Sequence, residues 1–203
     1  MFGTVNHYDM YSTQYQYFYN NWYTSFSEYP PLQRHWFWDN YVELESSGIY
    51  VGSIGNDTII GSAETDYLFG GSGNDVVYGG QGDDIINGGA GNDSIEGARG
   101  NDMMWGDLGS DSYYFYGFAT GSDTIYESGF DTDYLVFSGG VQRENIFFQQ
   151  QGNDLMVAIG RVDGDDVALT STILIKDQFN SATSNGVEYI RIVGDPEVYA
   201  LPT

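Results

Sequence analysis

The chain of 203 residues contains no cysteine, only four prolines and only two histidines. Without cysteine, neither disulfide bonds nor thiolate metal sites can form, although this absence assigns no cellular compartment. The two histidines, His7 and His35, belong to no H-E-x-x-H zinc motif, and the sequence contains no G-x-S-x-G nucleophile motif. We therefore expect a protein that is not an enzyme.

Positive charge is also scarce in this sequence. Six lysines and arginines stand against 29 aspartates and glutamates, which gives a formal net charge of −23. Nucleic acid is excluded as a partner, because phosphate binding needs a surface of lysine and arginine. An acidic charge of this density repels itself and destabilises a compact chain. Hard divalent cations with oxygen ligands relieve that repulsion directly.

Long apolar runs are missing as well. No run approaches the roughly 20 residues that a membrane-spanning helix needs, so we expect no membrane insertion. The first residues, MFGTVNHYDMYSTQ, lack the basic start and apolar core of a cleavable signal peptide. If the protein leaves the cell, we expect it to use another export signal.

What the chain does contain is a nine-residue period between Gly52 and Tyr114. Seven blocks, from GSIGNDTII to GDLGSDSYY, follow one another without insertion or deletion. Each block opens with glycine, and a strict period of this kind indicates a repeat architecture. The sixth place is always aspartate: Asp57, Asp66, Asp75, Asp84, Asp93, Asp102 and Asp111. The eighth place is always large and apolar: Ile59, Leu68, Val77, Ile86, Ile95, Met104 and Tyr113.

The block G-G-x-G-N/D-D-x-U-x combines a turn of six residues with a short strand of three. Glycine suits the turn because it allows a positive φ and a close approach of neighbouring backbone. Stacked turns would gather backbone carbonyls and aspartate carboxylates into a cage of oxygens. Calcium takes six to eight such oxygens, so the repeat predicts calcium sites, with the eighth-place side chains pointing inward.

These blocks closely resemble the RTX (repeats-in-toxin) calcium-binding family. The resemblance implies a right-handed parallel β-roll in which two blocks form one coil, so that blocks two apart stack with an ion between them. Asp57, Asp75, Asp93 and Asp111 would then follow one edge, and Asp66, Asp84 and Asp102 the other. Adjacent pairs would frame about five calcium sites. The fifth-place residues would orient the turn or lend an oxygen: Asn56, Asn74, Asp83, Asn92 and Asn101.

Two blocks depart from the pattern. In the second block, Ser62 and Glu64 replace glycines, so we expect the site that uses Asp66 to be weaker or distorted. In the last block, Asp107 replaces the second glycine, and we expect it to alter the end site.

Residues 117–203 read as strands separated by Gly, Asp, Asn and Ser turns, in runs such as DYLVF, DLMVAI and VEYIRI. They are similar to the β-rich segment that caps RTX rolls in secreted bacterial proteins. The resemblance implies a β-sandwich-like cap on the roll of residues 51–116, with an uncleaved type I secretion signal near the C-terminus. It also implies that Asp123 and Asp133 extend the calcium ladder, the alternative being that they are turn formers.

Residues 1–50 form a third, aromatic-rich region. From Tyr8 to Phe26 the aromatic residues follow a three/four spacing that predicts an amphipathic helix, although Tyr15, Tyr17 and Tyr19 also alternate as in a strand. Residues 32–45 predict a second short helix after Pro30-Pro31. The region could cap the roll, mediate assembly, or stack on sugars. The predicted fold is thus all-β, with an N-terminal segment that is helical or extended.

The seventh and ninth places should face outward from the roll, yet several are apolar. On the face formed by the second, fourth and sixth blocks they are Tyr67, Phe69, Ile85, Asn87, Met103 and Trp105. Such a strip is seldom left to water, so we expect either the N-terminal segment or a neighbouring subunit to cover it.

Together these features predict a secreted bacterial protein that folds on calcium and self-assembles as a subunit of a surface layer, filament or matrix. Two alternatives remain. One is a calcium-dependent adhesin or lectin that binds polysaccharide, and the other is an accessory calcium module for a separate secreted enzyme.

Overall fold

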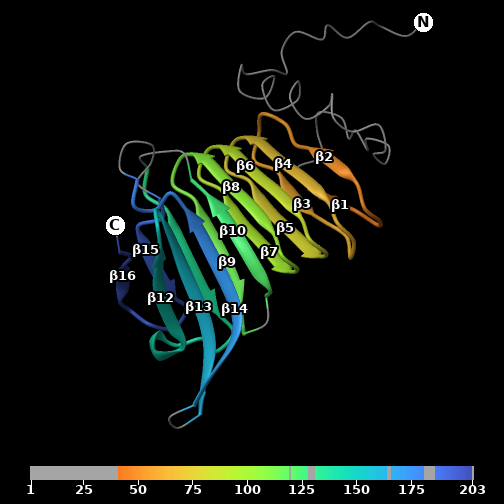
Figure 1. The fold of residues 1–203 in the computed structure, drawn as a ribbon. Coiled ribbons are helices and arrows are strands. Elements are labelled where there is room, and N and C mark those ends of the chain that lie inside the picture. Colours follow the sequence, from red (N-terminus) through yellow and green to blue (C-terminus); the bar gives the residue numbers. More distant parts are fainter. Residues whose placement is uncertain (1–40, 119, 128–130, 164–165, 181–185, 203) are drawn as a thin grey trace, which may run out of the picture. The chain divides into compact units, whose positions relative to one another are not determined.

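The computed structural model describes residues 41–118, 120–127, 131–163, 166–180 and 186–202 (Figure 1). All of them lie in one compact unit, Leu32–Thr203. The aromatic pattern from Tyr8 to Phe26 and most of the second predicted helix lie outside the described residues.

The described chain folds into two eight-stranded sheets, here called sheet A and sheet B. Sheet A has the order β1 (Tyr41–Glu43), β3 (Thr58–Ile60), β5 (Val76–Gln81), β7 (Ser94–Arg99), β9 (Ser112–Tyr116), β11 (Tyr134–Ser138), β15 (Tyr189–Ile192) and β16 (Val198–Ala200). Sheet B has the order β12 (Ile146–Gln151), β13 (Asp154–Asp163), β14 (Asp166–Lys176), β10 (Ser122–Tyr126), β8 (Met103–Leu108), β6 (Ile85–Ala90), β4 (Tyr67–Ser72) and β2 (Ile49–Val51). The only helical element among the described residues is a 3-10 turn, η1 (Arg143–Asn145).

Each strand of the repeat region pairs in parallel with the strand two places along the chain, so successive strands alternate between the sheets (Figure 1). The register equals two nine-residue periods: Ile59 lies beside Val77, and Val77 beside Ile95. All seven eighth-place side chains are 0% exposed, because both sheets direct this place into the space between them. The all-β parallel roll predicted from the repeat is therefore confirmed.

Strands β4 to β8 have six residues each, more than the three that the repeat predicts. β4 and β6, for example, also pair through the opening of the next block, where Gly71 lies beside Gly89 and Ser72 beside Ala90. Identical turns stacked on one another bring their backbone groups into register as well, so the pairing continues through part of the turn.

The predicted cap continues both sheets of the roll. β10 and β14 extend sheet B in parallel, and β11 and β15 extend sheet A in parallel. Antiparallel β13, β12 and β16 then complete the two sheets. The core is therefore continuous from Val42 to Leu201.

The roll begins before the first nonapeptide. β1 pairs with β3, and β2 pairs with β4, so residues 41–51 form strands of the first coil. The predicted second helix is thus wrong for its described end, residues 41–45. Val42 and Leu44 are buried while Tyr41 and Glu43 are exposed, and this alternation suits a strand rather than a helix. In the described part of the chain, no helix has the length and apolar character to cross a membrane.

Candidate metal centre

The sixth-place aspartates form two hydrogen-bonded ladders, one along each edge of the roll. On the first edge, the backbone N–H of each aspartate donates to Oδ1 of the aspartate in the next coil. These N···O distances are 2.7 Å from Asp57 to Asp75, 2.8 Å from Asp75 to Asp93 and 2.7 Å from Asp93 to Asp111. The second edge runs from Asp66 to Asp84 at 2.8 Å and from Asp84 to Asp102 at 2.9 Å. This is the division into two edges that the family resemblance implies.

Both ladders continue into the cap. The Asp102 N–H donates to Asp123 Oδ1 at 3.0 Å, and the Asp111 N–H donates to Asp133 Oδ1 at 2.8 Å. Asp123 and Asp133 are as buried as the repeat aspartates, at 3% and 2% exposure. Their carboxylates therefore stand at ladder positions, whereas a turn former would bond its own neighbouring backbone.

The ladder uses only one oxygen of each carboxylate. In five turns the other oxygen, Oδ2, is buried and accepts no hydrogen bond from any described residue; the five are Asp75, Asp84, Asp93, Asp102 and Asp111. A buried anionic oxygen without a partner is costly unless a cation or a proton neutralises it. Rows of hard, unpartnered oxygens are the donor set that calcium prefers, so these residues fit a calcium ion.

The same five turns share a backbone conformation. The residue at the second place of each has a positive φ: Gly71 (115°), Gly80 (109°), Gly89 (109°), Ala98 (71°) and Asp107 (69°). In none of these turns does the N–H of the second-place residue donate to the sixth-place Oδ2. The left-handed turn and the unpartnered oxygen therefore occur together.

The first two blocks are built differently. Ser53 stands at the second place of the first block, and its N–H and hydroxyl donate to Asp57 Oδ2 at 2.7 and 2.9 Å. Ser62 makes the same pair of bonds to Asp66 Oδ2 at 2.6 and 2.9 Å. Neither serine has a positive φ. The Oδ2 atoms of these two carboxylates thus have donors from the protein itself.

The family model of the RTX calcium-binding nonapeptide repeat matches residues 51–86 and 78–113, four copies in all. Residues 51–113 are RTX calcium-binding nonapeptide repeats. The chain therefore contains a calcium-binding RTX repeat region of the β-roll type.

One similar solved structure is the solution structure of the AlgE6R3 subunit from the Azotobacter vinelandii mannuronan C5-epimerase. It is 18% identical, with a TM-score of 0.24, and the match covers 77% of this chain and 87% of that chain. A search of the curated proteins gives no match.

Burial of the RTX aspartates makes their charged form unfavourable. It raises the pKa of Asp75 and Asp84 to about 7 and that of Asp111 to about 8. In the cap, burial raises the pKa of Asp123 to about 8 and that of Asp133 to about 7. Hydrogen bonds from the ladder N–H groups act in the opposite direction but do not cancel the effect of burial. The folded chain without a cation therefore favours protonated carboxyl groups.

The fifth-place residues of the RTX turns form an exposed ladder of their own. The N–H of Asn74 donates to Asn56 Oδ1, and that of Asn92 to Asn74 Oδ1, both at 2.8 Å. On the other edge the Asn101 N–H donates to Asp83 Oδ1 at 2.8 Å. Of the two predicted roles, this geometry favours orienting the turn, because the side-chain oxygen is already bonded to backbone.

The structure also brings two glutamates to the ladder that the repeat pattern does not indicate. The Asp133 N–H donates to Glu188 Oε2 at 2.8 Å, so Glu188 extends the first ladder by one more step. A signal for it exists, because Glu188 directly precedes β15 as Asp111 precedes β9 and Asp133 precedes β11. Glu127 follows β10 and carries no repeat signal, because it stands where the repeat has glycine.

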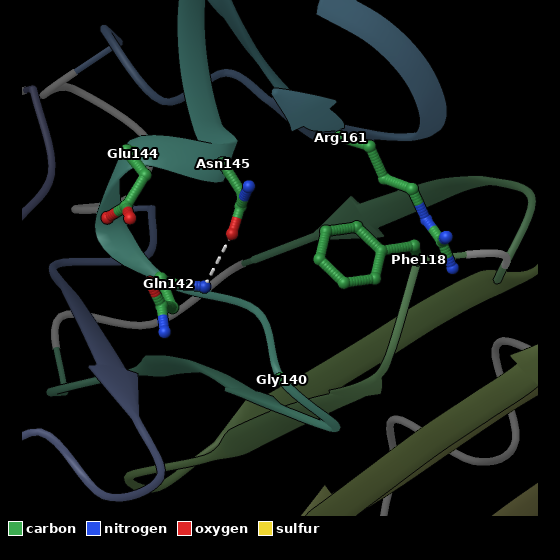
Figure 2. A pocket seen from close by; sticks show the side chains of 6 residues that line it. All are labelled: Phe118, Gly140, Gln142, Glu144, Asn145 and Arg161. Carbon is green, nitrogen blue, oxygen red and sulfur yellow. Dashed lines mark hydrogen bonds between the residues drawn. The ribbon is translucent and has the colours of Figure 1, made fainter. Parts of the chain in front are cut away.

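A separate surface hollow lies beside η1 (Figure 2). Asn145 Oδ1 accepts a hydrogen bond from the Gln142 N–H at 2.8 Å. The Arg161 guanidinium lies 5.1 Å from the centroid of the Phe118 ring. The side chains of Asn145 and Arg161 thus make contacts within the cap. The residues that line the hollow include none of the ladder carboxylates.

Proposed function

We propose that this protein is an extracellular bacterial protein that folds on binding calcium and then serves as a structural, self-assembling subunit. The observation that carries the calcium-dependent step is the set of five buried, unpartnered Oδ2 atoms along the two edges of the roll, in a chain of net charge −23. Folding without cations would bring these carboxylates together out of water, with nothing to neutralise them.

This electrostatic cost makes folding depend on the calcium concentration. At the low calcium level of the cytoplasm the chain stays expanded and suited to export by its C-terminal signal. Outside the cell, where extracellular calcium modules bind with Kd values of roughly 10⁻⁴–10⁻³ M, the ions fill the ladders. Because the sites exist only in the folded roll, their binding free energy becomes folding free energy.

The outer face of sheet B supports assembly. The register places Tyr67 beside Ile85 and Ile85 beside Met103, in one row of half-buried side chains. In the neighbouring row Trp105 stacks on Tyr126, with ring centroids 4.5 Å apart and planes at 5°. We propose that this strip, defined by these five residues, packs against another copy of the chain. A contiguous apolar strip on a calcium-stiffened roll suits a building block.

Calcium titration of the purified chain tests this function. We expect circular dichroism to report an unfolded-to-β transition, followed by ordered polymers in light scattering and electron microscopy. Ile85→Lys should keep the transition and lose the polymers. Ser94→Lys, at the same repeat place on sheet A, is the matched control and should still polymerise.

Other results would contradict the proposal. A chain that is folded and equally stable without calcium would overturn the switch. A persistent monomer that is retained on polysaccharide would favour an adhesin over a structural subunit. Removing residues 1–31, which leaves the compact unit Leu32–Thr203 whole, asks whether the aromatic N-terminal segment contributes to either behaviour.

A further inference from the structure

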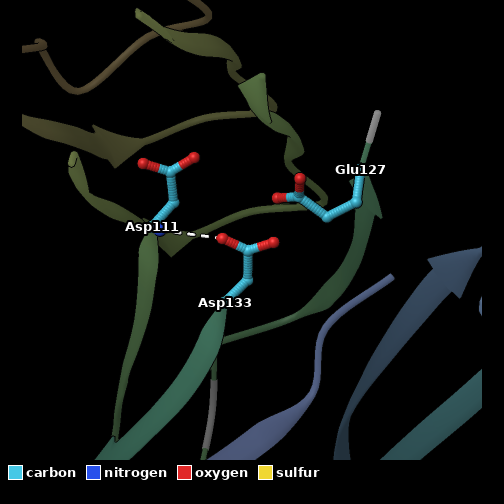
Figure 3. A group of neighbouring side chains, drawn as sticks. All are labelled: Asp111, Glu127 and Asp133. Carbon is cyan, nitrogen blue, oxygen red and sulfur yellow. Dashed lines mark hydrogen bonds between the residues drawn. The ribbon is translucent and has the colours of Figure 1, made fainter. Parts of the chain in front are cut away.

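We propose that Asp111, Glu127 and Asp133 form a distinct calcium site at the C-terminal end of the first ladder, with Glu127 as a ligand that the nonapeptide does not supply. The inference rests on the calcium binding of the proposed function and adds a site of different composition. Each residue offers a carboxylate oxygen, and these oxygens all lie within 4.8 Å of one another. Figure 3 shows the three carboxylates gathered at the ends of their elements.

Glu127 reaches this place because of the register. Tyr126 lies beside Trp105, so Glu127 follows at the level of Gly106 one coil earlier. A Cβ on Gly106 would lie 2.2 Å from Asp111 Oδ2 and 2.8 Å from the Tyr113 hydroxyl. The first place of a block therefore borders the sixth-place carboxylate. In the next coil a glutamate stands there and brings a third carboxylate beside the ladder.

The hydrogen bonds leave this cluster with charge to neutralise. Asp111 Oδ1 accepts the Asp93 N–H, Asp133 Oδ1 accepts the Asp111 N–H, and Glu127 Oε1 accepts the Tyr113 hydroxyl. Asp111 Oδ2 and Glu127 Oε2 are buried and accept no hydrogen bond from the described residues. Exposure of the three side chains is 0%, 9% and 2% in chain order, so water does not screen them.

The composition of the cluster predicts which ion it binds and how its calcium affinity compares with that of the repeat sites. All three groups are hard carboxylate donors without nitrogen or sulfur, which suits calcium rather than zinc. A repeat site takes its charge from two sixth-place aspartates, whereas this site has three carboxylates. Calcium affinity rises with the number of charged ligands, so this site should fill first. Filling it would fix the junction between roll and cap.

Isothermal titration calorimetry of Glu127→Gln against wild type tests the site. Glutamine keeps the shape of the side chain and an acceptor for the Tyr113 hydroxyl but removes the charge. We expect the tightest calcium to be lost or weakened by about tenfold or more. Glu96→Gln, a half-buried glutamate in β7 outside the cluster, is the matched control and should keep the full number of ions.

Two further variants separate ligation from packing. Glu127→Asp keeps the charge, and so the charge balance of the folded chain, but withdraws the carboxylate by one methylene; it should weaken the same ion. Tyr113→Phe keeps all three carboxylates and should retain the ion. If Tyr113→Phe lost it as Glu127→Gln does, Glu127 would act through Tyr113 and the proposal would be wrong.

The outcomes also separate this inference from the proposed function. If wild type bound no calcium, both would fail. If wild type folded with calcium, but Glu127→Gln and Glu127→Asp bound the same number of ions with the same affinities, only the terminal site would fail.

Discussion

The Ser62 N–H and hydroxyl both donate to Asp66 Oδ2, at 2.6 and 2.9 Å. Two donors thus serve the Oδ2 atom, which five other turns of the roll leave without a hydrogen-bond donor. Ser53 and Asp57 repeat the arrangement on the opposite edge. The coil formed by the first two nonapeptides therefore has the Oδ2 atoms of Asp57 and Asp66 hydrogen-bonded before any ion binds. It can serve as a calcium-independent base on which later coils stack.

The double substitution Ser62→Gly with Glu64→Gly restores the repeat pattern and should create calcium dependence where it is now absent. Glycine at the second place permits the left-handed turn, so the Ser62 donors leave Asp66 Oδ2 and the oxygen becomes available to an ion. We expect calorimetry to show one more bound calcium or a tighter site. Without calcium, the variant should lose roughly 1–3 kcal/mol of unfolding free energy, as for a buried charge that loses its donors.

The control for this variant is Ser72→Gly, at the third place of the next block. Ser72 is half-buried, and its N–H bonds the Ser53 carbonyl oxygen, a bond that glycine keeps. The number of bound ions should not change in the control. An unchanged ion number in the double variant would show that Ser62 does not determine whether Asp66 binds calcium.

Asp93→Ala should remove more than one calcium. Its Oδ1 accepts the Asp75 N–H at 2.8 Å, and its own N–H donates to Asp111 Oδ1 at 2.7 Å, so the residue joins the turns on both sides. Removing the carboxylate takes a ligand from the calcium sites on both sides of Asp93. It also leaves the Asp75 N–H without its acceptor. Asp83→Ala, on an exposed fifth-place side chain, is the control and should keep the ion number. Calorimetry that found full stoichiometry in Asp93→Ala would disprove the shared-ligand arrangement.

Calcium binding should weaken in acid, while the calcium-free fold should gain stability. Burial raises the pKa of Asp75 and Asp84 from 3.8 to about 7, and that of Asp111 to about 8. Between about pH 4 and 7 the folded state without calcium then binds more protons than the unfolded state. Its stability is therefore greatest at the acid end of this window and falls as pH rises. Protons and calcium compete for the same oxygens, so calcium affinity should fall as pH drops from 8 to 6.

Circular dichroism in chelator and calorimetry at pH 6, 7 and 8 measure the two effects separately. Glu144→Gln, an exposed glutamate of η1, should leave both pH dependences unchanged. A calcium affinity that stays constant between pH 6 and 8 would show that the ladder carboxyl groups do not bind protons in this range.

The repeat made the roll predictable in detail. Its period gave the strand register, and Ile59, Val77 and Ile95 lie in one buried row as the eighth place predicted. A fixed period leaves few ways to stack, since a slip of one residue would turn the buried eighth-place side chains to the outer face.

The ends of the roll were not predictable in the same way. Tyr41–Glu43 forms a strand only because β3 offers it a parallel edge, which no local pattern reveals. Glu188 and Glu127 meet the first ladder through a pairing across 55 residues and through the register of β10 with β8. Long-range stacking determines these positions, whereas sequence spacing describes only the interior repeats.

Gly91→Ala should break the stack of turns. Gly91 has φ of 139°, and a Cβ there would lie 1.9 Å from the Gly73 carbonyl oxygen, which is backbone and cannot move aside. We expect a loss of about 4 kcal/mol or more in unfolding free energy at saturating calcium, measured by denaturant titration. Gly140→Ala is the matched control, because Gly140 also has a positive φ, 88°, but a Cβ would meet nothing within 4 Å. The control should cost about 1–2 kcal/mol, the strain of the left-handed backbone alone. Equal losses in the two variants would mean that coils are not in contact at Gly73 and Gly91, and that the spacing along the roll is wider than the ladder of carboxylates requires.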